Sequence, residues 1–220
     1  MKLLCLHGMY QRSCIFRSKT AHLGMPGVEL AFLDGPINLV PKVVSTSSKQ
    51  VDTKGFKAWW DPAQPLAMAD RAQLLRYVGD AMDRDGPFDG VLGFSQGAVL
   101  ASWLCSNFAK HELGWAPSLA VLLGGYCDPR DVASIFEGGL VPTVASFHAY
   151  GINDRVVSAA KSEQLAALFE AETPGRVTRH VHQQGHIIPK CPMVYDALQD
   201  FLGEMDETIA QPPLQQAQQA

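Results

Sequence analysis

The stretch Gly93-Phe94-Ser95-Gln96-Gly97 decides the fold, because it joins an apolar run at 90–94 to a helical pattern at 97–108. It matches the pattern G-x-S-x-G in the strand-turn-helix context that this pattern requires. A serine on so sharp a turn is held above the sheet, and a β-carbon at either flanking position would collide with the adjacent strand or helix. The stretch therefore predicts that Ser95 is a nucleophile at the end of a buried strand.

Strand and helix patterns alternate on both sides of this turn. Short apolar runs closed by Gly, Asp or Pro predict buried strands, and longer segments with one apolar face predict helices. The expected strands are 2–6, 28–33, 90–94, 119–123, 144–150 and 176–181, and the expected helices are 15–23, 65–83, 97–108, 159–169 and 192–202. This order, with the serine turn, predicts an α/β-hydrolase fold with a mostly parallel central sheet and helices on both faces.

The length of the chain predicts one domain. With 220 residues and 47% hydrophobic content, it can bury one substantial core but is short for two. We expect a single domain at 1–203 and a disordered tail at 204–220, whose Gln- and Pro-rich end has few apolar side chains to offset the entropy of ordering. The polar stretch at 42–57 lacks periodicity and is expected to be a functional surface loop.

Composition and charge exclude several classes of protein. A formal net charge of -4 with scattered Lys and Arg residues gives no basic surface for nucleic acid. No segment approaches the ~20 apolar residues of a membrane span, and the first apolar stretch is too short for a signal peptide. Five cysteines without CxxC spacing suit a reducing compartment. We therefore expect a soluble, cytoplasmic protein that binds neither nucleic acid nor membrane.

A serine hydroxyl is a weak nucleophile at neutral pH and needs a base and an orienting acid, which follow in the order Ser, Asp, His in this fold. Asp154 stands in the turn just past the expected strand 144–150. His186 stands in a glycine-preceded loop after the last expected strand, 176–181. We therefore predict a catalytic triad of Ser95, Asp154 and His186.

Two alternatives concern neighbouring residues. Asp128 also follows a buried strand, but Asp154 better fits the strand position that carries the acid in this fold. His180 and His182 share one side of a strand and form with His186 a possible metal cluster, yet no carboxylate or cysteine completes the set. We expect both histidines on a sheet surface and expect that the reaction needs no metal or cofactor.

The oxyanion hole requires two backbone N–H groups. Gln96 stands at the amino end of the expected helix 97–108, where its N–H is free to bind an oxyanion. The second donor should come from the loop after the first strand, and we predict the N–H of Met9, with Tyr10 as the alternative. His7 in the same loop is expected to be a structural hydrogen-bonding residue.

These features resemble the fungal and animal family of small serine hydrolases (the FSH family), which includes hydrolases similar to ovarian-cancer-associated protein 2 and thioesterases of fungal polyketide gene clusters. The resemblance spans nearly the whole chain. It rests on Leu4-Cys5-Leu6-His7-Gly8, Phe16, Lys19-Thr20, Leu33-Asp34-Gly35-Pro36, Trp59-Trp60, Gly93-Phe94-Ser95-Gln96-Gly97-Ala98, Asn153-Asp154-Arg155-Val156-Val157 and Gly185-His186-Ile187-Ile188-Pro189.

The resemblance implies a hydrolase without a large lid domain, acting on substrates that range from short esters to acyl chains carried on a synthase. It favours a thioesterase that releases or edits a polyketide-type chain, with a synthase acyl carrier domain as a transient partner. Three alternatives remain: a short-chain carboxylesterase, an acyl-transferring or cyclising enzyme with the same acyl-serine, and a non-catalytic binding protein that has kept the fold.

Large side chains near the expected mouth of the site indicate the substrate class. Met9, Tyr10, Trp59 and Trp60 are apolar or amphipathic, which favours an apolar acyl chain over a sugar or a phosphate. We expect Tyr10, Trp59 and Trp60 to bind substrate, although the two tryptophans have an equal alternative role as core anchors of the loop.

Overall fold

Short apolar runs form the middle strands of the central sheet, because strands covered on both faces bury nearly every side chain. The computed structural model describes residues 1–23, 26–39, 55–61, 63–64 and 66–210. Its 6-stranded sheet has the order β2-β1-β5-β6-β7-β8, and every neighbouring pair is parallel. The strands are β1 (Lys2–Leu6), β2 (Glu29–Leu33), β5 (Gly90–Phe94), β6 (Leu119–Leu123), β7 (Ala145–Gly151) and β8 (Val177–His182). The predicted, mostly parallel sheet is confirmed.

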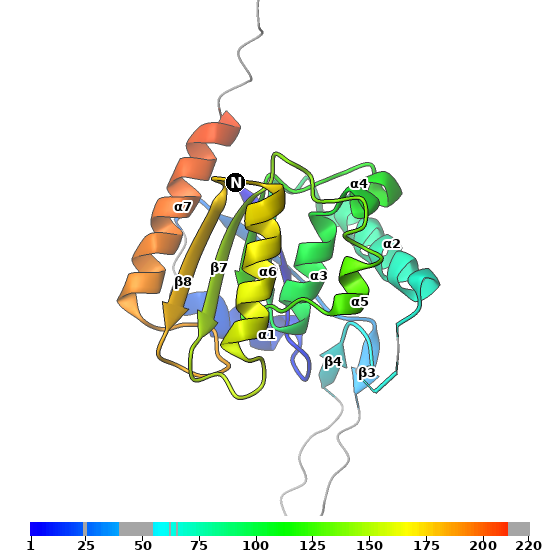
Figure 1. The fold of residues 1–220 in the computed structure, drawn as a ribbon, viewed down its shortest axis with the longest axis horizontal. Coiled ribbons are helices and arrows are strands. Elements are labelled where there is room, and N and C mark those ends of the chain that lie inside the picture. Colours follow the sequence, from blue (N-terminus) through cyan, green and yellow to red (C-terminus); the bar gives the residue numbers. More distant parts are fainter. Residues whose placement is uncertain (24–25, 40–54, 62, 65, 211–220) are drawn as a thin grey trace, which may run out of the picture.

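Helices cover both faces of this sheet (Figure 1). Phe16 of α1 and Leu198 of α7 pack in the apolar cluster on one face, whereas Leu75, Leu100 and Phe169 of α2, α3 and α6 pack in the cluster on the other. The helices are α1 (Ser13–Thr20), α2 (Met68–Asp85), α3 (Gln96–Leu104), α4 (Asn107–Leu113), α5 (Pro129–Val132), α6 (Ala159–Glu172) and α7 (Pro192–Ala210), with the 3₁₀ helix η1 (Ala21–Leu23). No helix in the described ranges is long and apolar enough to cross a membrane.

A hairpin of two short strands was not expected from the sequence. β3 (Ile37–Leu39) and β4 (Phe56–Ala58) pair in antiparallel fashion, and three residues are too few to show a strand period. The Lys57 N–H donates to Gln11 O (2.9 Å), which fastens the hairpin to the loop after β1. Of the loop expected at 42–57, residues 42–54 lie outside the described residues.

Every expected helix differs from the structure at one end or both, and two of them differ most. The helix expected at 97–108 is two helices, because Ser106 caps a new one by accepting a hydrogen bond from the Ala109 N–H (3.0 Å). The last helix extends to Ala210, since Met205 and Ile209 continue its apolar face onto the core. Residues 204–210 are therefore helical, not part of a disordered tail, and 211–220 lie outside the described residues.

Candidate active site

The turn between β5 and α3 holds Ser95 in a backbone conformation that L-residues rarely adopt, with φ of 53° and ψ of -119°. Its N–H donates to Leu123 O of the neighbouring strand (2.9 Å), which fixes the turn against the sheet. A strained conformation of this kind persists only where the surroundings determine it. The hydroxyl of Ser95 consequently stands at the carboxyl end of the sheet.

Glycines on both sides of Ser95 allow this turn. A β-carbon on Gly97 would lie 2.0 Å from Leu6 O, and one on Gly93 would lie 2.3 Å from Gly97 O. Both obstacles are backbone atoms, which cannot rotate away as a side chain can. The expected need for glycine at the two positions therefore has a steric basis in the structure.

Gly97→Ala is expected to lower the free energy of unfolding by about 3 kcal/mol or more, because the new methyl group forces the Leu6 backbone out of its place. Urea denaturation measures the loss. Gly203→Ala is the matched control, since nothing lies within 4 Å of a β-carbon there and alanine favours the helix. Equal stabilities of the two variants would contradict the steric role of Gly97.

Ser95, His186 and Asp154 form one chain of hydrogen bonds. His186 Nε2 lies 2.8 Å from Ser95 Oγ, and His186 Nδ1 lies 2.6 Å from Asp154 Oδ2. Asp154 Oδ1 accepts the N–H groups of Val156 and Val157 at 2.8 Å each, which fixes the orientation of the carboxylate. A carboxylate at Nδ1 keeps the proton on that nitrogen and leaves Nε2 free to accept the serine proton.

The loops that carry the acid and the base are bonded to each other. The Ile152 N–H donates to His182 O (2.8 Å), and Asn153 Nδ2 donates to Gln183 O (2.6 Å). Gly124, after β6, lies against the imidazole, since a β-carbon there would be 3.4 Å from His186 Cε1. The ring of Phe94 covers the same imidazole, with centroids 5.0 Å apart. No local pattern in the sequence predicts these contacts, because they join residues far apart in the chain.

Asp128, the alternative acid, is bonded elsewhere. Its side chain accepts from the Arg130 N–H (2.9 Å) and forms an ion pair with the Arg130 guanidinium (2.6 Å). The hydrogen bond to the Arg130 side chain lowers the pKa of Asp128 to about 2. Asp128 thus caps the short helix α5, and the structure brings Asp154 to the histidine instead.

The two expected oxyanion donors differ in what surrounds them. Gln96 begins α3, where the first N–H groups of a helix have no partner within the helix. The Tyr10 N–H donates to Lys57 O (3.0 Å) and is thereby occupied, whereas the Met9 N–H makes no hydrogen bond to the described residues. Gly8 lies beside the nucleophile, since a β-carbon there would be 3.3 Å from Ser95 Cβ. This arrangement favours Met9 over Tyr10.

His7 is a structural residue in the loop after β1. It is fully buried, its Nε2 accepts the Gly35 N–H (2.9 Å), and its Nδ1 lies 2.8 Å from Gly8 O. Burial lowers the pKa of His7, so the ring is neutral and its Nδ1–H donates to Gly8 O. The Asp-Gly-Pro element is thereby tied to the oxyanion loop, and Tyr77 donates to Asp34 O (2.8 Å) from the other side.

The two adjacent tryptophans have different roles. Trp59 is only 2% exposed, its indole N–H donates to His7 O (2.7 Å), and its backbone N–H donates to Gln96 Oε1 (3.0 Å). It is therefore a core anchor, the alternative that the sequence left open. Trp60 is half-buried and stacks on Trp103, with centroids 5.0 Å apart. Tyr10 is half exposed at the expected mouth of the site.

A groove of about 380 Å³ lies beside Trp60. Gln96 Nε2 donates to Trp60 O (2.9 Å), so the residue next to the nucleophile also holds the wall of the groove. This role of the Gln96 side chain was not anticipated. The apolar part of the groove is lined by Pro36, Ile37, Trp59, Trp60, Leu66, Leu74 and Tyr77.

The histidines of β8 lie on the sheet face that α7 covers. His180 is half-buried and stacks on Phe147, which also contacts Phe201 of α7. His182 is 3% exposed, so its expected place on a sheet surface is wrong. It is buried because alternate strand residues share a face, and this face is packed. Within the described ranges, no group of three or more His, Cys, Asp or Glu residues is arranged to hold a metal ion.

Comparisons with known proteins agree with this geometry. Residues 1–197 match the family described as serine hydrolase (FSH1). The chain is 32% identical to human esterase OVCA2, over 94% of this chain and 97% of that protein, and 28% identical to esterase C25G4.2 of Caenorhabditis elegans, over 93% of each. The crystal structure of acyl-protein thioesterase 2 from Zea mays has the same fold, with 21% identity, a TM-score of 0.67 and 93% of each chain covered.

A carboxylesterase of Bacillus cereus also shares the fold, with 21% identity, a TM-score of 0.63, and coverage of 92% of this chain and 87% of that one. The α/β-hydrolase fold predicted from the serine turn is thereby confirmed. With a family match over nine-tenths of its length and esterases among its relatives, the chain is an enzyme and belongs to the FSH1 family of serine hydrolases.

Proposed function

We propose that this hydrolase cleaves an ester or thioester of an apolar acyl chain through an acyl-Ser95 intermediate. The observation that supports it is the unbroken chain of hydrogen bonds from Asp154 through His186 to Ser95. Such a chain lets a neutral imidazole take the serine proton at the moment of attack.

The reaction then runs in two halves. Ser95 Oγ attacks the acyl carbon while its proton passes to His186 Nε2, and the N–H groups of Gln96 and Met9 hold the oxyanion. As the tetrahedral intermediate collapses, the bond to the alcohol or thiol breaks, and His186 gives that leaving group its proton. In the second half, water gives a proton to His186 Nε2 and attacks the acyl carbon. As the bond to Ser95 Oγ breaks, His186 returns the proton to that oxygen and the acid leaves. Asp154 keeps the imidazole oriented and stabilises its charged form.

The apolar groove beside Trp60 supports the choice of an acyl chain. Within the family, a thioesterase that releases or edits a polyketide-type chain from a synthase carrier domain is the role we favour. Free cysteines at all five positions suit a cytoplasmic location.

The value of kcat/KM should rise roughly two- to fourfold per methylene of the acyl chain until the groove is filled, because each buried CH₂ contributes about 0.8 kcal/mol. A series of acyl thioesters, with products identified by mass, measures the climb. Trp60→Ala should reduce the rise of kcat/KM with chain length, because it opens the wall of the groove. Trp115→Ala should keep the same rise, since Trp115 donates to Phe88 O and does not line the groove. A preference for the shortest ester in all three proteins would contradict the proposed substrate class.

A further inference from the structure

A second pocket, of about 220 Å³, shares Trp60 with the apolar groove but has a polar lining. Its position connects it to the catalytic centre. The Val99 N–H donates to Ser95 O (3.1 Å), so Val99 stands one helical turn beyond the nucleophile. Tyr126 follows Gly124, the residue that lies against the His186 ring, by two positions. Both Val99 and Tyr126 line the pocket, which therefore comes within one helical turn of Ser95 along α3.

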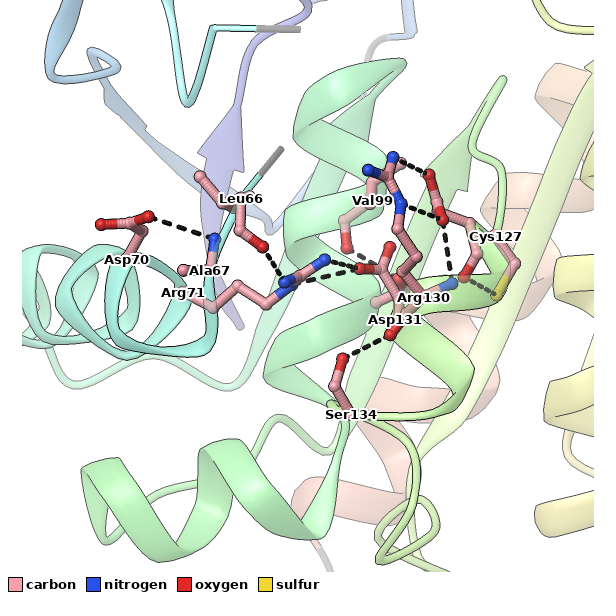
Figure 2. A network of polar contacts seen from close by, with 11 residues as sticks. Leu66, Ala67, Asp70, Arg71, Val99, Cys127, Arg130, Asp131 and Ser134 are labelled. Atoms are coloured by element: carbon pink, nitrogen blue, oxygen red, sulfur yellow. Dashed lines mark hydrogen bonds and ion pairs between the residues drawn. The ribbon is translucent and has the colours of Figure 1, made fainter. Parts of the chain in front are cut away.

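Two ion pairs determine the charge of this pocket (Figure 2). Arg71 and Asp131 are buried and lie 2.8 Å apart, and Arg130 and Asp128 lie 2.6 Å apart at the surface. Arg71 also donates to Leu66 O, so each of its three guanidinium nitrogens makes a hydrogen bond. The four charges sum to zero. An anionic ligand would meet two carboxylates and a cationic ligand two guanidinium groups, so the pocket suits an uncharged molecule.

The remaining polar groups offer hydrogen bonds to such a molecule. The Tyr126 side chain lines the pocket, and no hydrogen bond to the described residues engages its hydroxyl. Burial raises the pKa of Tyr126, so this hydroxyl keeps its proton at neutral pH and can both donate and accept. Arg130 is exposed beside it and carries N–H groups at the rim. Hydrogen-bond donors and acceptors in a pocket whose net charge is zero match an amide or a hydroxyl group of the ligand.

We propose that this polar pocket binds the leaving group of the substrate, an uncharged alcohol or thiol that carries an amide or hydroxyl group. The acyl chain then lies in the apolar groove, and Trp60 separates the two halves of the substrate. The inference rests on the proposed hydrolysis at Ser95. The polar pocket would make the enzyme selective for the alcohol or thiol, which leaves before the acyl group does.

Two thioesters with the same acyl chain test the subsite, one of N-acetylcysteamine and one of pentanethiol, which matches it in length but has no amide. In the parent enzyme, kcat/KM should be higher for the amide-bearing thioester. In Tyr126→Phe, the ratio of the two kcat/KM values should fall about three- to tenfold, the effect of one hydrogen bond. Because each variant is compared with the parent on the same pair, the intrinsic reactivities of the two thiols cancel.

Arg130→Gln should lower the ratio in the same direction. Arg84→Gln is its control, since Arg84 forms a similar exposed pair with its neighbour Asp85 outside the pocket. An unchanged ratio in Tyr126→Phe and Arg130→Gln, in an active enzyme, overturns the subsite and leaves the hydrolase intact. A second pair of thioesters differs in the acyl half, one with a 3-hydroxyacyl chain and one with the plain chain. If Tyr126→Phe loses a preference for the 3-hydroxyacyl chain but keeps the preference for the amide-bearing thiol, the pocket binds the acyl half, and the proposal is overturned. No hydrolysis of either thioester by the parent overturns both the proposed function and the subsite.

Discussion

Replacing His186 with alanine is expected to lower kcat by at least on the order of a thousandfold. The imidazole lies 2.8 Å from Ser95 Oγ and is the group that takes its proton. Without it the serine hydroxyl keeps its proton at neutral pH, and only the oxyanion donors and substrate binding still favour the reaction. Steady-state turnover of a medium-chain acyl thioester measures the loss.

His111→Ala is the matched control, because His111 is exposed on α4 and lines neither the apolar groove nor the polar pocket. It should retain the kcat of the parent. A fluorophosphonate should label the parent at Ser95, label Ser95→Ala not at all, and label His186→Ala slowly. Near-normal turnover of folded His186→Ala would remove this residue from the mechanism, and equal labelling of Ser95→Ala would remove the serine.

The central strands of the sheet could be predicted from the sequence because they are almost completely buried. β5 and β6 have the predicted ends, because every residue in them is buried and the apolar run coincides with the strand. The hairpin of β3 and β4 was missed, since its pairing joins Ile37 to Ala58 across a long stretch and leaves no local period. The break between α3 and α4 was also missed, because the apolar pattern continues through Ser106, where the cap begins a new helix.

The site divides in the same way. Residues with a fixed chemical role could be predicted, since the order Ser, Asp, His and the glycines at the turn follow from what the reaction and the turn require. The separate roles of Trp59 and Trp60 could not be predicted, because two adjacent residues of one type differ only in the direction in which their side chains point. The acceptor for the Trp59 indole is His7 O, and the amide that holds both backbones belongs to Gln96. Neither contact has a signal in the local sequence.

Asp154→Asn is expected to lower kcat by about three to four orders of magnitude with little change in structure. The asparagine keeps the shape of the side chain, and its oxygen can still accept the N–H groups of Val156 and Val157. Its amide group, however, meets His186 Nδ1, favours the proton on Nε2, and so deprives Ser95 of an acceptor. The charge that stabilises the imidazolium is lost as well. Turnover at equal concentrations of folded protein measures both effects together.

Asp128→Asn makes the same chemical change at the other candidate acid. There the carboxylate faces Arg130 in a partly exposed pair that solvent screens, and it does not contact the base, so kcat should fall by less than about tenfold. The comparison is informative because both aspartates follow neighbouring strands at the same edge of the sheet and differ in the partner they meet. A larger loss of kcat in Asp128→Asn than in Asp154→Asn would mean that the 2.6 Å contact between Asp154 and His186 does not orient the base.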